Sequence, residues 1–359
     1  VYKRQILKNN QMTFTAPLQA FAYWEKNTPN QQMFNQPFPE GPVKMSYHEA
    51  GIEIRKLAQA LINLDYAPKS KIALLSKNCS HWIMADLAIQ MAGHISVPIY
   101  PTINADSIAQ IMTHSESKAV IIGKLDNYDT QKSGLKDFIK IGIKAYQIEE
   151  TSSWEDMVES SEELEILPEQ KAEDLLTIMY TSGTTDNPKG IMFSQFNMMS
   201  KRFSRALALP DIGSNDIFLC YLPLYHTFGR YFEMMGSLFW GATYSFAASP
   251  AFNSLLNDFK IIRPTIFISI PKRWVQLYDM LDSALDLGSD PKEDIKKQLN
   301  KITGGDLKWG LSAAGYLDSD IFSFFHDQGI KLLSGYGMTE ATGGITMTPP
   351  HDLSLIHIS

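Results

Sequence analysis

Cysteine is scarce in this sequence of 359 residues. Only Cys79 and Cys220 are present, 141 positions apart and in unlike surroundings. A disulfide-stabilised fold needs several cysteines, and a structural zinc site needs closely spaced ones, so neither is expected. The fold therefore has to depend on a hydrophobic core, for which 44% hydrophobic residues supply ample material.

Positive charge is also in short supply. Lys and Arg number 32 against 39 Asp and Glu, the formal net charge is −7, and no run of basic residues occurs. This balance disfavours a nucleic-acid partner. No uninterrupted apolar run reaches the roughly 18 residues that cross a bilayer. We therefore expect a soluble, cytoplasmic protein, and we leave open a peripheral contact with a membrane and the oligomeric state.

The two ends of the chain resemble translated DNA adapter. Residues 353–357 (LSLIH) can be encoded CTG TCT CTT ATA CAC, and the reverse complement of that DNA encodes residues 1–5 (VYKRQ). The element is similar to the transposon-end adapter of sequencing libraries. We therefore expect residues 1–5 and 353–359 to be adapter, and a single nucleotide-binding domain to cover residues 12–352.

Helix and strand patterns alternate along the chain. Residues 46–49 (SYHE) have the spacing of a helix capping box, which predicts a helix that runs to residue 64. Further helices are expected at 82–91, 105–113 and within 283–304, and strands at 72–75, 95–100, 119–122, 175–180, 261–270 and 331–334. This alternation is typical of an α/β fold. An acidic, turn-rich connection at 148–174 suggests a subdivision of the domain there.

A loop rich in hydroxyl groups follows the strand predicted at 175–180. Residues 180–190 read YTSGTTDNPKG. Gly183 allows backbone amides to approach an anion, and Lys189 adds a compact positive charge. The hydroxyl donors are Thr181, Ser182, Thr184 and Thr185. These groups suit a polyphosphate, although the spacing is not that of the P-loop of nucleoside triphosphatases. An ordinary flexible surface loop is the alternative interpretation.

This loop resembles the signature phosphate loop of the adenylate-forming, or AMP-binding, superfamily, which includes acyl-CoA synthetases, luciferases and peptide-synthetase adenylation domains. The family usually has glycine where Asp186 stands, and aspartate tolerates the left-handed backbone better than most residues. The resemblance implies an α/β fold: the large N-terminal domain of these enzymes, with stacked sheet subdomains. It also implies that the small C-terminal domain is missing from this chain.

Two further segments resemble the family's nucleotide-binding motifs, in the expected order. Residues 333–340 (LSGYGMTE) imply that Tyr336 and Gly337 contact the nucleotide, Tyr336 by stacking on adenine, that Thr339 meets the α-phosphate and that Glu340 holds Mg²⁺. Residues 311–317 (LSAAGYL) imply contacts of Ala313, Ala314 and Gly315 with the adenine, with Tyr316 where the family usually has proline. Taken alone, either segment could be a simple turn.

The acid-binding motif of the family is similar to residues 221–230 (YLPLYHTFGR), which places His226 near the acyl carboxylate. A lone histidine among aromatics is more often a core residue. The segments 78–82, 97–102, 263–265 and 271–274 look like those of long-chain acyl-CoA synthetases. An amino-acid substrate is disfavoured because residues 247–251 (AASPA) offer no acid for its amino group. An apolar lining for an alkyl chain, or simple core packing, is expected of Phe228, Tyr231, Phe232, Met234, Met235, Phe239 and Trp240.

The resemblance implies ATP-dependent activation of a long-chain fatty acid to the acyl-adenylate and then to acyl-CoA, with ATP, Mg²⁺ and coenzyme A as cofactors or co-substrates. The catalytic residues would be His226, Lys189 and Glu340. The ribose-binding aspartate, hinge arginine and C-terminal lysine of the family cannot be assigned, so we expect this chain to bind MgATP weakly and turn over little. Three alternatives remain: the adenylation domain of a carboxylic acid reductase, an inactive nucleotide-binding module, and a membrane scaffold that uses residues 231–246 as its surface.

Overall fold

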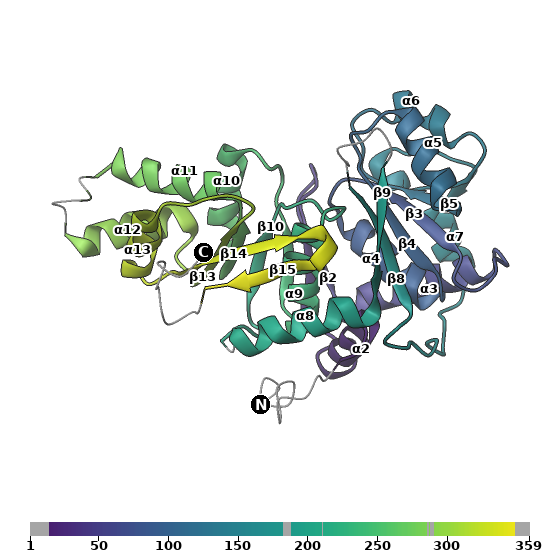
Figure 1. Ribbon diagram of the computed structural model, residues 1–359, viewed down its shortest axis with the longest axis horizontal. Coiled ribbons are helices and arrows are strands. Elements are labelled where there is room, and N and C mark those ends of the chain that lie inside the picture. Colours follow the sequence, from purple (N-terminus) through teal and green to yellow (C-terminus); the bar gives the residue numbers. More distant parts are fainter. Residues whose placement is uncertain (1–13, 182–187, 210, 286, 288–290, 349–359) are drawn as a thin grey trace.

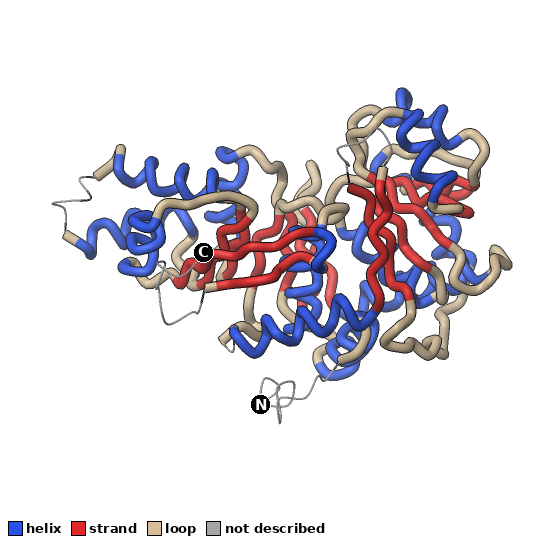
Figure 2. Tube along the Cα trace, viewed as in Figure 1, coloured by secondary structure: helices blue, strands red, loops and turns tan. Residues whose placement is uncertain are grey.

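The computed structural model describes residues 14–181, 188–209, 211–285, 287 and 291–348. Within them, two β-sheets flanked by helices form two lobes, with the first sheet on the right of Figure 1 and the second on the left. The colouring in Figure 2 shows strands at the centre of each lobe and helices outside. This arrangement confirms the predicted α/β fold. The segments predicted to be adapter, residues 1–5 and 353–359, lie outside the described residues.

The first sheet is mostly parallel. Its strand order in the described chain is β7-β6-β5-β3-β4-β8-β9. The strands are β3 (Lys71–Leu75), β4 (Ile95–Ile99), β5 (Ser117–Ile122), β6 (Ile139–Gly142), β7 (Ser152–Ser153), β8 (Leu175–Thr181) and β9 (Lys189–Ser194). The helical connections are α4 (Ser80–Met91), α5 (Ala105–His114), α6 (Tyr128–Gln131), η2 (Lys132–Leu135), η3 (Lys144–Tyr146) and α7 (Trp154–Ser160). Only β8 and β9 pair in antiparallel orientation, as a hairpin at the sheet edge.

The second sheet has the order β15-β14-β13-β12-β10-β11-β1-β2 in the described chain. Its strands are β1 (Gln32–Gln36), β2 (Val43–Ser46), β10 (Ile217–Cys220), β11 (Thr243–Phe246), β12 (Ile266–Ser269), β13 (Trp309–Ala313), β14 (Lys331–Met338) and β15 (Gly343–Met347). Its two edge strands, β2 and β15, are antiparallel to their neighbours, and the central strands are parallel. Residues that follow β10, β13 and β14 therefore meet at one edge of the sheet, where open α/β sheets bind ligands.

The helices of the second lobe and of the N-terminal part complete the fold. They are α2 (Pro17–Asn27), α3 (Tyr47–Ile62), α8 (Gln195–Ala208), η4 (Phe228–Met234), α9 (Met235–Trp240), α10 (Phe252–Ile262), α11 (Pro271–Asp282), α12 (Lys292–Thr303), α13 (Ser319–Asp327) and η5 (Thr339–Ala341). The capping box predicted at the start of α3 is confirmed: the Ser46 hydroxyl accepts from the Glu49 amide, and the Glu49 carboxylate accepts from the Ser46 amide. Ser194 and Asn197 make the same reciprocal pair at the start of α8.

The predicted strand over residues 261–270 is wrong at its beginning. Residues 261 and 262 are the last two of α10, and only Ile266–Ser269 forms β12. Arg263 ends the helix in a left-handed conformation with φ of 53°, and Pro264 follows it. A proline disfavours helical backbone in the residue before it, so an apolar run that looks continuous in sequence is divided between a helix and a strand. The other predicted strands are confirmed within one to four residues at their ends.

One hydrophobic core joins the two lobes. The largest cluster of buried side chains contains Ile72 and Trp82 from the first lobe together with Phe218 and Leu311 from the second. Helix α4 has apolar side chains all round apart from the buried Asp86 and Gln90, and it lies almost wholly buried within the fold. Both cysteines are buried and unpaired. No helix in the described ranges is long and apolar enough to cross a bilayer.

The chain changes sheet after β9. The acidic connection at 148–174, where we expect a subdivision, contains β7 and α7 and leads into β8. Strands β1 and β2 belong to the second sheet, and the chain crosses to the first sheet through α3; since β8 and β9 pair with the first sheet, it returns to the second lobe through α8. Helix α8 therefore begins at the phosphate-loop hairpin and runs along the second lobe (Figure 1).

Candidate functional site

The histidine segment is held between the two lobes. Asn78, at the end of β3, donates its amide N–H to the Leu222 carbonyl (2.7 Å), and its side-chain oxygen accepts from the Leu224 amide (2.9 Å). A side chain at Gly229 would collide with backbone, since its Cβ would lie 2.4 Å from the Pro223 carbonyl oxygen. The turn that carries His226 is therefore fixed both by a side-chain clamp and by close backbone packing.

His226 is exposed at the opening of a cavity. Its Nδ1 accepts a hydrogen bond from the Phe228 amide (3.1 Å). Because Nδ1 acts as the acceptor, the proton of the neutral ring resides on Nε2, which can donate to an oxygen of a ligand. Partial desolvation in the cavity lowers the pKa of His226 below its usual value. The residue is therefore a neutral hydrogen-bond donor at neutral pH.

Under the activity that the sequence resemblance implies, His226→Ala should raise the KM for the acid about tenfold or more, because a hydrogen bond to a charged group contributes about 1.5–3 kcal/mol. The KM for ATP should change little. Because the pKa of His226 is lowered, the histidine becomes protonated only as the pH falls below about 6.5. The wild-type kcat/KM for the acid should therefore decrease only below that pH. A pH profile of acid-dependent pyrophosphate exchange checks this, and a His226-dependent inflection above that pH would contradict it.

The small-residue segment lies at the end of β13. Ala313 is the last residue of the strand, and Ala314 adopts a left-handed conformation with φ of 64°. Such a conformation is uncommon for a residue other than glycine and is often found at ligand sites. It turns the chain sharply, so Ala313 and Ala314 line the cavity with small side chains, whereas Gly315 packs beside Pro271 and does not line it.

Strand β14, the neighbour of β13 in the sheet, and the residues that follow it provide the polar end of the cavity. Tyr336 and Gly337 lie near the end of β14, and Thr339 and Glu340 follow in η5. A β-bulge between Tyr336 and Gly337 shifts the pairing with β15. Gly337 is required there, because an added Cβ would lie 2.0 Å from the Gly343 carbonyl oxygen. Tyr336 is left 60% exposed, so one face of its ring is available for stacking.

One cavity of about 300 Å³ brings these segments together. The residues that line it are His226, Thr227, Phe228, Phe232, Ala313, Ala314, Gly335, Tyr336, Gly337, Met338, Thr339, Glu340 and Gly343. The hydroxyls of Thr227 and Thr339, which both line it, lie 3.5 Å apart and connect the histidine segment to η5. Seven of the predicted nucleotide- and acid-binding residues therefore share one space, although the histidine segment lies more than 80 positions before the other two segments in the sequence.

The phosphate loop is described only at its base. Thr181 and Lys189 are register partners in the β8–β9 hairpin, so the two residues face each other where the loop begins and ends. Lys189 is exposed. The predicted phosphate ligands Ser182, Gly183, Thr184 and Thr185 lie outside the described residues, as does Asp186. Neither Thr181 nor Lys189 lines the 300 Å³ cavity.

Glu340 is the acidic side chain of that cavity. In the described part of the chain, no group of three or more His, Cys, Asp or Glu residues could hold a metal ion by itself. Mg²⁺ usually takes one or two carboxylates together with phosphate oxygens and water. A single carboxylate beside the threonine hydroxyls therefore fits magnesium delivered with a nucleotide, and does not fit a dedicated protein metal site.

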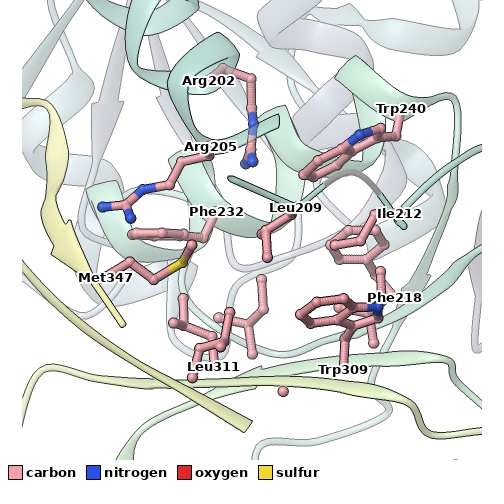
Figure 3. A pocket seen from close by; sticks show the side chains of 14 residues that line it. Arg202, Arg205, Leu209, Ile212, Phe218, Phe232, Trp240, Trp309, Leu311 and Met347 are labelled. Carbon is pink, nitrogen blue, oxygen red and sulfur yellow. The ribbon is translucent and has the colours of Figure 1, made fainter. Parts of the chain in front are cut away.

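A second, smaller cavity of about 30 Å³ lies deeper in the second lobe (Figure 3). Apolar side chains line most of it, and Arg202 and Arg205 of α8 contribute as well. Phe232 lies in the walls of both cavities, and Trp240 lines only the deeper one. Of the residues expected to line an alkyl site, Phe228 and Phe232 line the larger cavity. Tyr231, Met234, Met235 and Phe239 line neither cavity and belong to the core.

Residues 231–246 cannot serve as a membrane surface. Every residue of this segment is buried, in η4, α9 and β11. The interpretation as an interfacial scaffold is therefore wrong for this segment. An aromatic-rich sequence suits a core as well as an interface, and here the segment packs against α2, α8 and β10.

Sequence reasoning missed a buried ion pair beside the site. Arg230 donates to the Asp86 carboxylate, to the Thr177 hydroxyl (2.6 Å) and to the Ser96 hydroxyl (3.0 Å). Arg230 and Asp86 are both fully buried. The Arg230 amide also donates to the His226 carbonyl (3.0 Å). The pair therefore connects the histidine segment to β4, to α4 and to β8, the strand that leads into the phosphate loop. The charge pattern of the sequence gave no sign of it, because the partners lie 144 positions apart.

The chain resembles known proteins along most of its length. The model of the family "AMP-binding enzyme" matches residues 21–358. The chain is 28% identical over 362 residues to fatty acyl-CoA synthetase A of Dictyostelium discoideum, covering 88% of this chain and 53% of the relative. It is 27% identical to long chain acyl-CoA synthetase 4 of Arabidopsis thaliana, covering 88% of this chain and 54% of the relative. The chain thus spans about half the length of these relatives.

Solved structures agree on the fold. The inhibitor-bound N-terminal domain of FACL13 from Mycobacterium tuberculosis superimposes with a TM-score of 0.77 at 20% identity, covering 94% of this chain and 80% of that one. A benzoate CoA ligase from Burkholderia xenovorans gives a TM-score of 0.75 at 19% identity, covering 93% of this chain and 63% of that one. The family match, the long-chain acyl-CoA synthetase relatives and the shared N-terminal-domain fold lead to one conclusion: the chain belongs to the AMP-binding, adenylate-forming enzyme family.

Proposed function

We propose that this chain is the nucleotide- and acid-binding part of a long-chain fatty-acid–CoA ligase. The observation that carries the proposal is the 300 Å³ cavity, in which a neutral histidine, a small-residue turn and the Tyr336–Glu340 segment share one space. The long-chain acyl-CoA synthetases among the curated relatives support the substrate class. The final thiol acceptor is proposed from the same relatives.

In the proposed reaction, a carboxylate oxygen of the fatty acid attacks the α-phosphorus of ATP. The bond to the bridging oxygen breaks, pyrophosphate leaves with that electron pair, and acyl-adenylate is formed. The thiolate of coenzyme A then attacks the acyl carbon and displaces AMP. Neither step needs a covalent enzyme nucleophile, so catalysis consists of positioning and charge neutralisation.

The chain's own residues divide this work. Tyr336 presents a ring face to adenine, and Ala313 and Ala314 leave room for it. His226 donates from Nε2 to the acid, while Thr339 donates to the α-phosphate. Lys189, with the hydroxyls of Thr181 and the loop that follows it, binds the departing pyrophosphate. Glu340 is the residue that would hold Mg²⁺, and a bound Mg²⁺ would neutralise charge on the phosphates.

Acid-dependent exchange of pyrophosphate into ATP tests the proposal. It should be measured with hexadecanoate on the 359-residue chain and on the product of the complete natural coding sequence. We expect weak exchange with the former and robust exchange with the latter, followed by thioester formation when coenzyme A is added. A reductase adenylation domain would show the exchange without free acyl-CoA release, and a binding module would show neither.

Lys189→Ala should lower this exchange about 10- to 140-fold, because a hydrogen bond to a charged group contributes about 1.5–3 kcal/mol and each 1.4 kcal/mol is tenfold in rate. Lys260→Ala is the matched control, since Lys260 is an exposed lysine on α10, outside both cavities. Equal exchange in the wild type and in Lys189→Ala would show that Lys189 does not contribute to adenylate formation.

A further inference from the structure

A fully buried carboxyl group lies behind the histidine segment. Glu233 is 0% exposed and belongs to η4, the helical segment that begins two residues after His226. Its Oε1 accepts from the backbone amides of Tyr221 (3.4 Å) and Leu222 (3.5 Å). The proposed reaction assigns this carboxyl group no role, although it contacts the backbone that leads to His226.

These contacts join the two ends of the loop that carries His226, residues 221–233, which we call the histidine loop. Strand β10 ends at Cys220, the chain then turns through His226, and η4 brings Glu233 back to the end of the strand. Within the turn, the His226 amide donates to the Pro223 carbonyl (3.1 Å). Glu233 therefore fixes the ends of the histidine loop from the second lobe, whereas Asn78 fixes its middle from the first.

A tyrosine of the neighbouring strand orients the carboxyl group. The Tyr244 hydroxyl on β11 donates to Oε2 of Glu233 at 3.3 Å, and Tyr244 is itself buried. Strand β11 pairs with β10, so the tyrosine reaches the carboxyl group from beside the strand end that the histidine loop leaves. Both oxygens of Glu233 thus have partners, and the carboxyl group is held on two sides.

No cation balances this carboxyl group. Among the described residues, no lysine, arginine or histidine forms an ion pair with Glu233. The titratable groups that face it are the Cys220 thiol and the phenols of Tyr221 and Tyr244, and α9, which contacts η4, carries none. Burial raises the pKa of Glu233 well above its usual value, which favours the protonated, uncharged form.

Asp86 shows how this fold buries a carboxylate that stays charged, because Asp86 is paired with the Arg230 guanidinium. The partners of Glu233 suit an uncharged group instead. One oxygen can accept from the two amides, and the protonated oxygen can donate to the Tyr244 hydroxyl, as the amide of a glutamine would. A charged carboxylate at this position would lie in the core without a counter-ion, which is unfavourable.

From this geometry we infer that Glu233 is a positioning residue for the acid substrate: as an uncharged carboxyl group it joins the ends of the histidine loop and so sets where His226 meets the acid. The inference rests on the proposed function, since that function places the acid at His226. Glu233 lines neither cavity, so it acts through the loop. The nucleotide side of the larger cavity belongs to β13, β14 and η5, so a displaced loop should affect the acid more than ATP.

Glu233→Met and Glu233→Gln test the inference by pyrophosphate exchange with hexadecanoate, measured on the product of the complete natural coding sequence. Glu233→Met removes both oxygens and keeps a side chain of similar length. We expect it to raise the KM for the acid about tenfold and to change the KM for ATP little, because the hydrogen bonds that place His226 are lost. Glu233→Gln can make the same hydrogen bonds without a charge, so it should retain both wild-type KM values.

Two results would overturn the inference. One is an unchanged KM for the acid in Glu233→Met, and the other is an equal rise of both KM values, because a purely structural role would disturb both substrates. A Glu233→Gln variant as impaired as Glu233→Met would show that the group acts as a charged carboxylate, against the inference.

Tyr244→Phe keeps the inference testable if Glu233→Met does not fold. It removes the hydroxyl that orients Glu233 and keeps the ring, so we expect the KM for the acid alone to rise about two- to threefold. Tyr47→Phe is the matched control, because Tyr47 is equally buried and its hydroxyl donates to the Ala242 carbonyl (3.5 Å), outside the histidine loop. The control should leave both KM values unchanged. Equal effects of the two substitutions on the acid would contradict the positioning role.

NMR of the 359-residue chain with ¹⁵N-labelled histidine separates this inference from the proposed function. The ring signals of His226, assigned by their absence in His226→Ala, report which nitrogen carries the proton. We expect the two signals to move closer together in Glu233→Met, as the hydrogen bond from the Phe228 amide to Nδ1 weakens, and to keep their wild-type positions in Glu233→Gln.

The two proposals therefore fail separately. Loss of exchange with every acid, in the product of the complete coding sequence, would refute the ligase function, and unchanged His226 signals in Glu233→Met would then refute the positioning role as well. Robust exchange with hexadecanoate and an unchanged KM for the acid in Glu233→Met would refute only the positioning role.

Discussion

Glu340→Gln should lower adenylate formation about 10²- to 10³-fold, mainly through kcat. The amide keeps the size and one oxygen of the side chain but removes the negative charge that a hard divalent cation requires. Metal-dependent charge stabilisation contributes several kcal/mol to reactions of this type, and each 1.4 kcal/mol is tenfold. Pyrophosphate exchange over a range of Mg²⁺ concentrations measures the effect, and the concentration of Mg²⁺ for half-maximal rate should rise.

Glu293→Gln is the control for this prediction. Glu293 is an exposed acid in the first turn of α12 and lines neither cavity. It should leave both the rate and the Mg²⁺ dependence unchanged. A Glu340→Gln variant with unaltered Mg²⁺ dependence would show that the metal lies elsewhere, even if its rate were lower.

Sequence reasoning succeeded where chemistry depends on local motifs. The alternation of patterns predicted the α/β fold, and the segments around His226, Ala313 and Tyr336 predicted residues that the fold gathers in one cavity. These residues lie at or beyond the carboxyl ends of β10, β13 and β14, which meet at one edge of a sheet. The parallel arrangement of these strands therefore brings three short motifs together in one site.

Sequence reasoning failed where the outcome depends on three-dimensional packing. The run at 261–270 contains isoleucines on both sides of Pro264, and the left-handed backbone at Arg263 divides it into a helix and a strand. The aromatic segment 231–246 was compatible with a membrane surface until its burial was known. The burial of Arg202 without an ion pair among the described residues could not be foreseen either, because the sequence does not show which residues face an arginine in the fold.

The Arg230–Asp86 pair should be the most sensitive single contact for stability. Arg230→Met should lower the free energy of unfolding by about 3–5 kcal/mol, because it leaves Asp86 as an unpaired charge in the core. Gln90 would be the remaining side-chain donor to that carboxylate among the described residues (2.9 Å). Urea unfolding followed by circular dichroism measures the change.

The double variant Arg230→Met with Asp86→Leu distinguishes the cost of an unpaired charge from that of lost packing. Replacing a whole buried ion pair by apolar residues of similar volume is often neutral or stabilising, so the double variant should recover most of the stability that Arg230→Met loses. If the double variant stays as unstable as Arg230→Met, the lost stability comes instead from the hydrogen bonds of Arg230 to the hydroxyls of Thr177 and Ser96. Both variants lack these bonds. In either case Arg230 joins the lobe that ends in the phosphate loop to the segment that carries His226. A variant that restores stability while adenylate formation stays low would therefore show that the pair also aligns the two halves of the site.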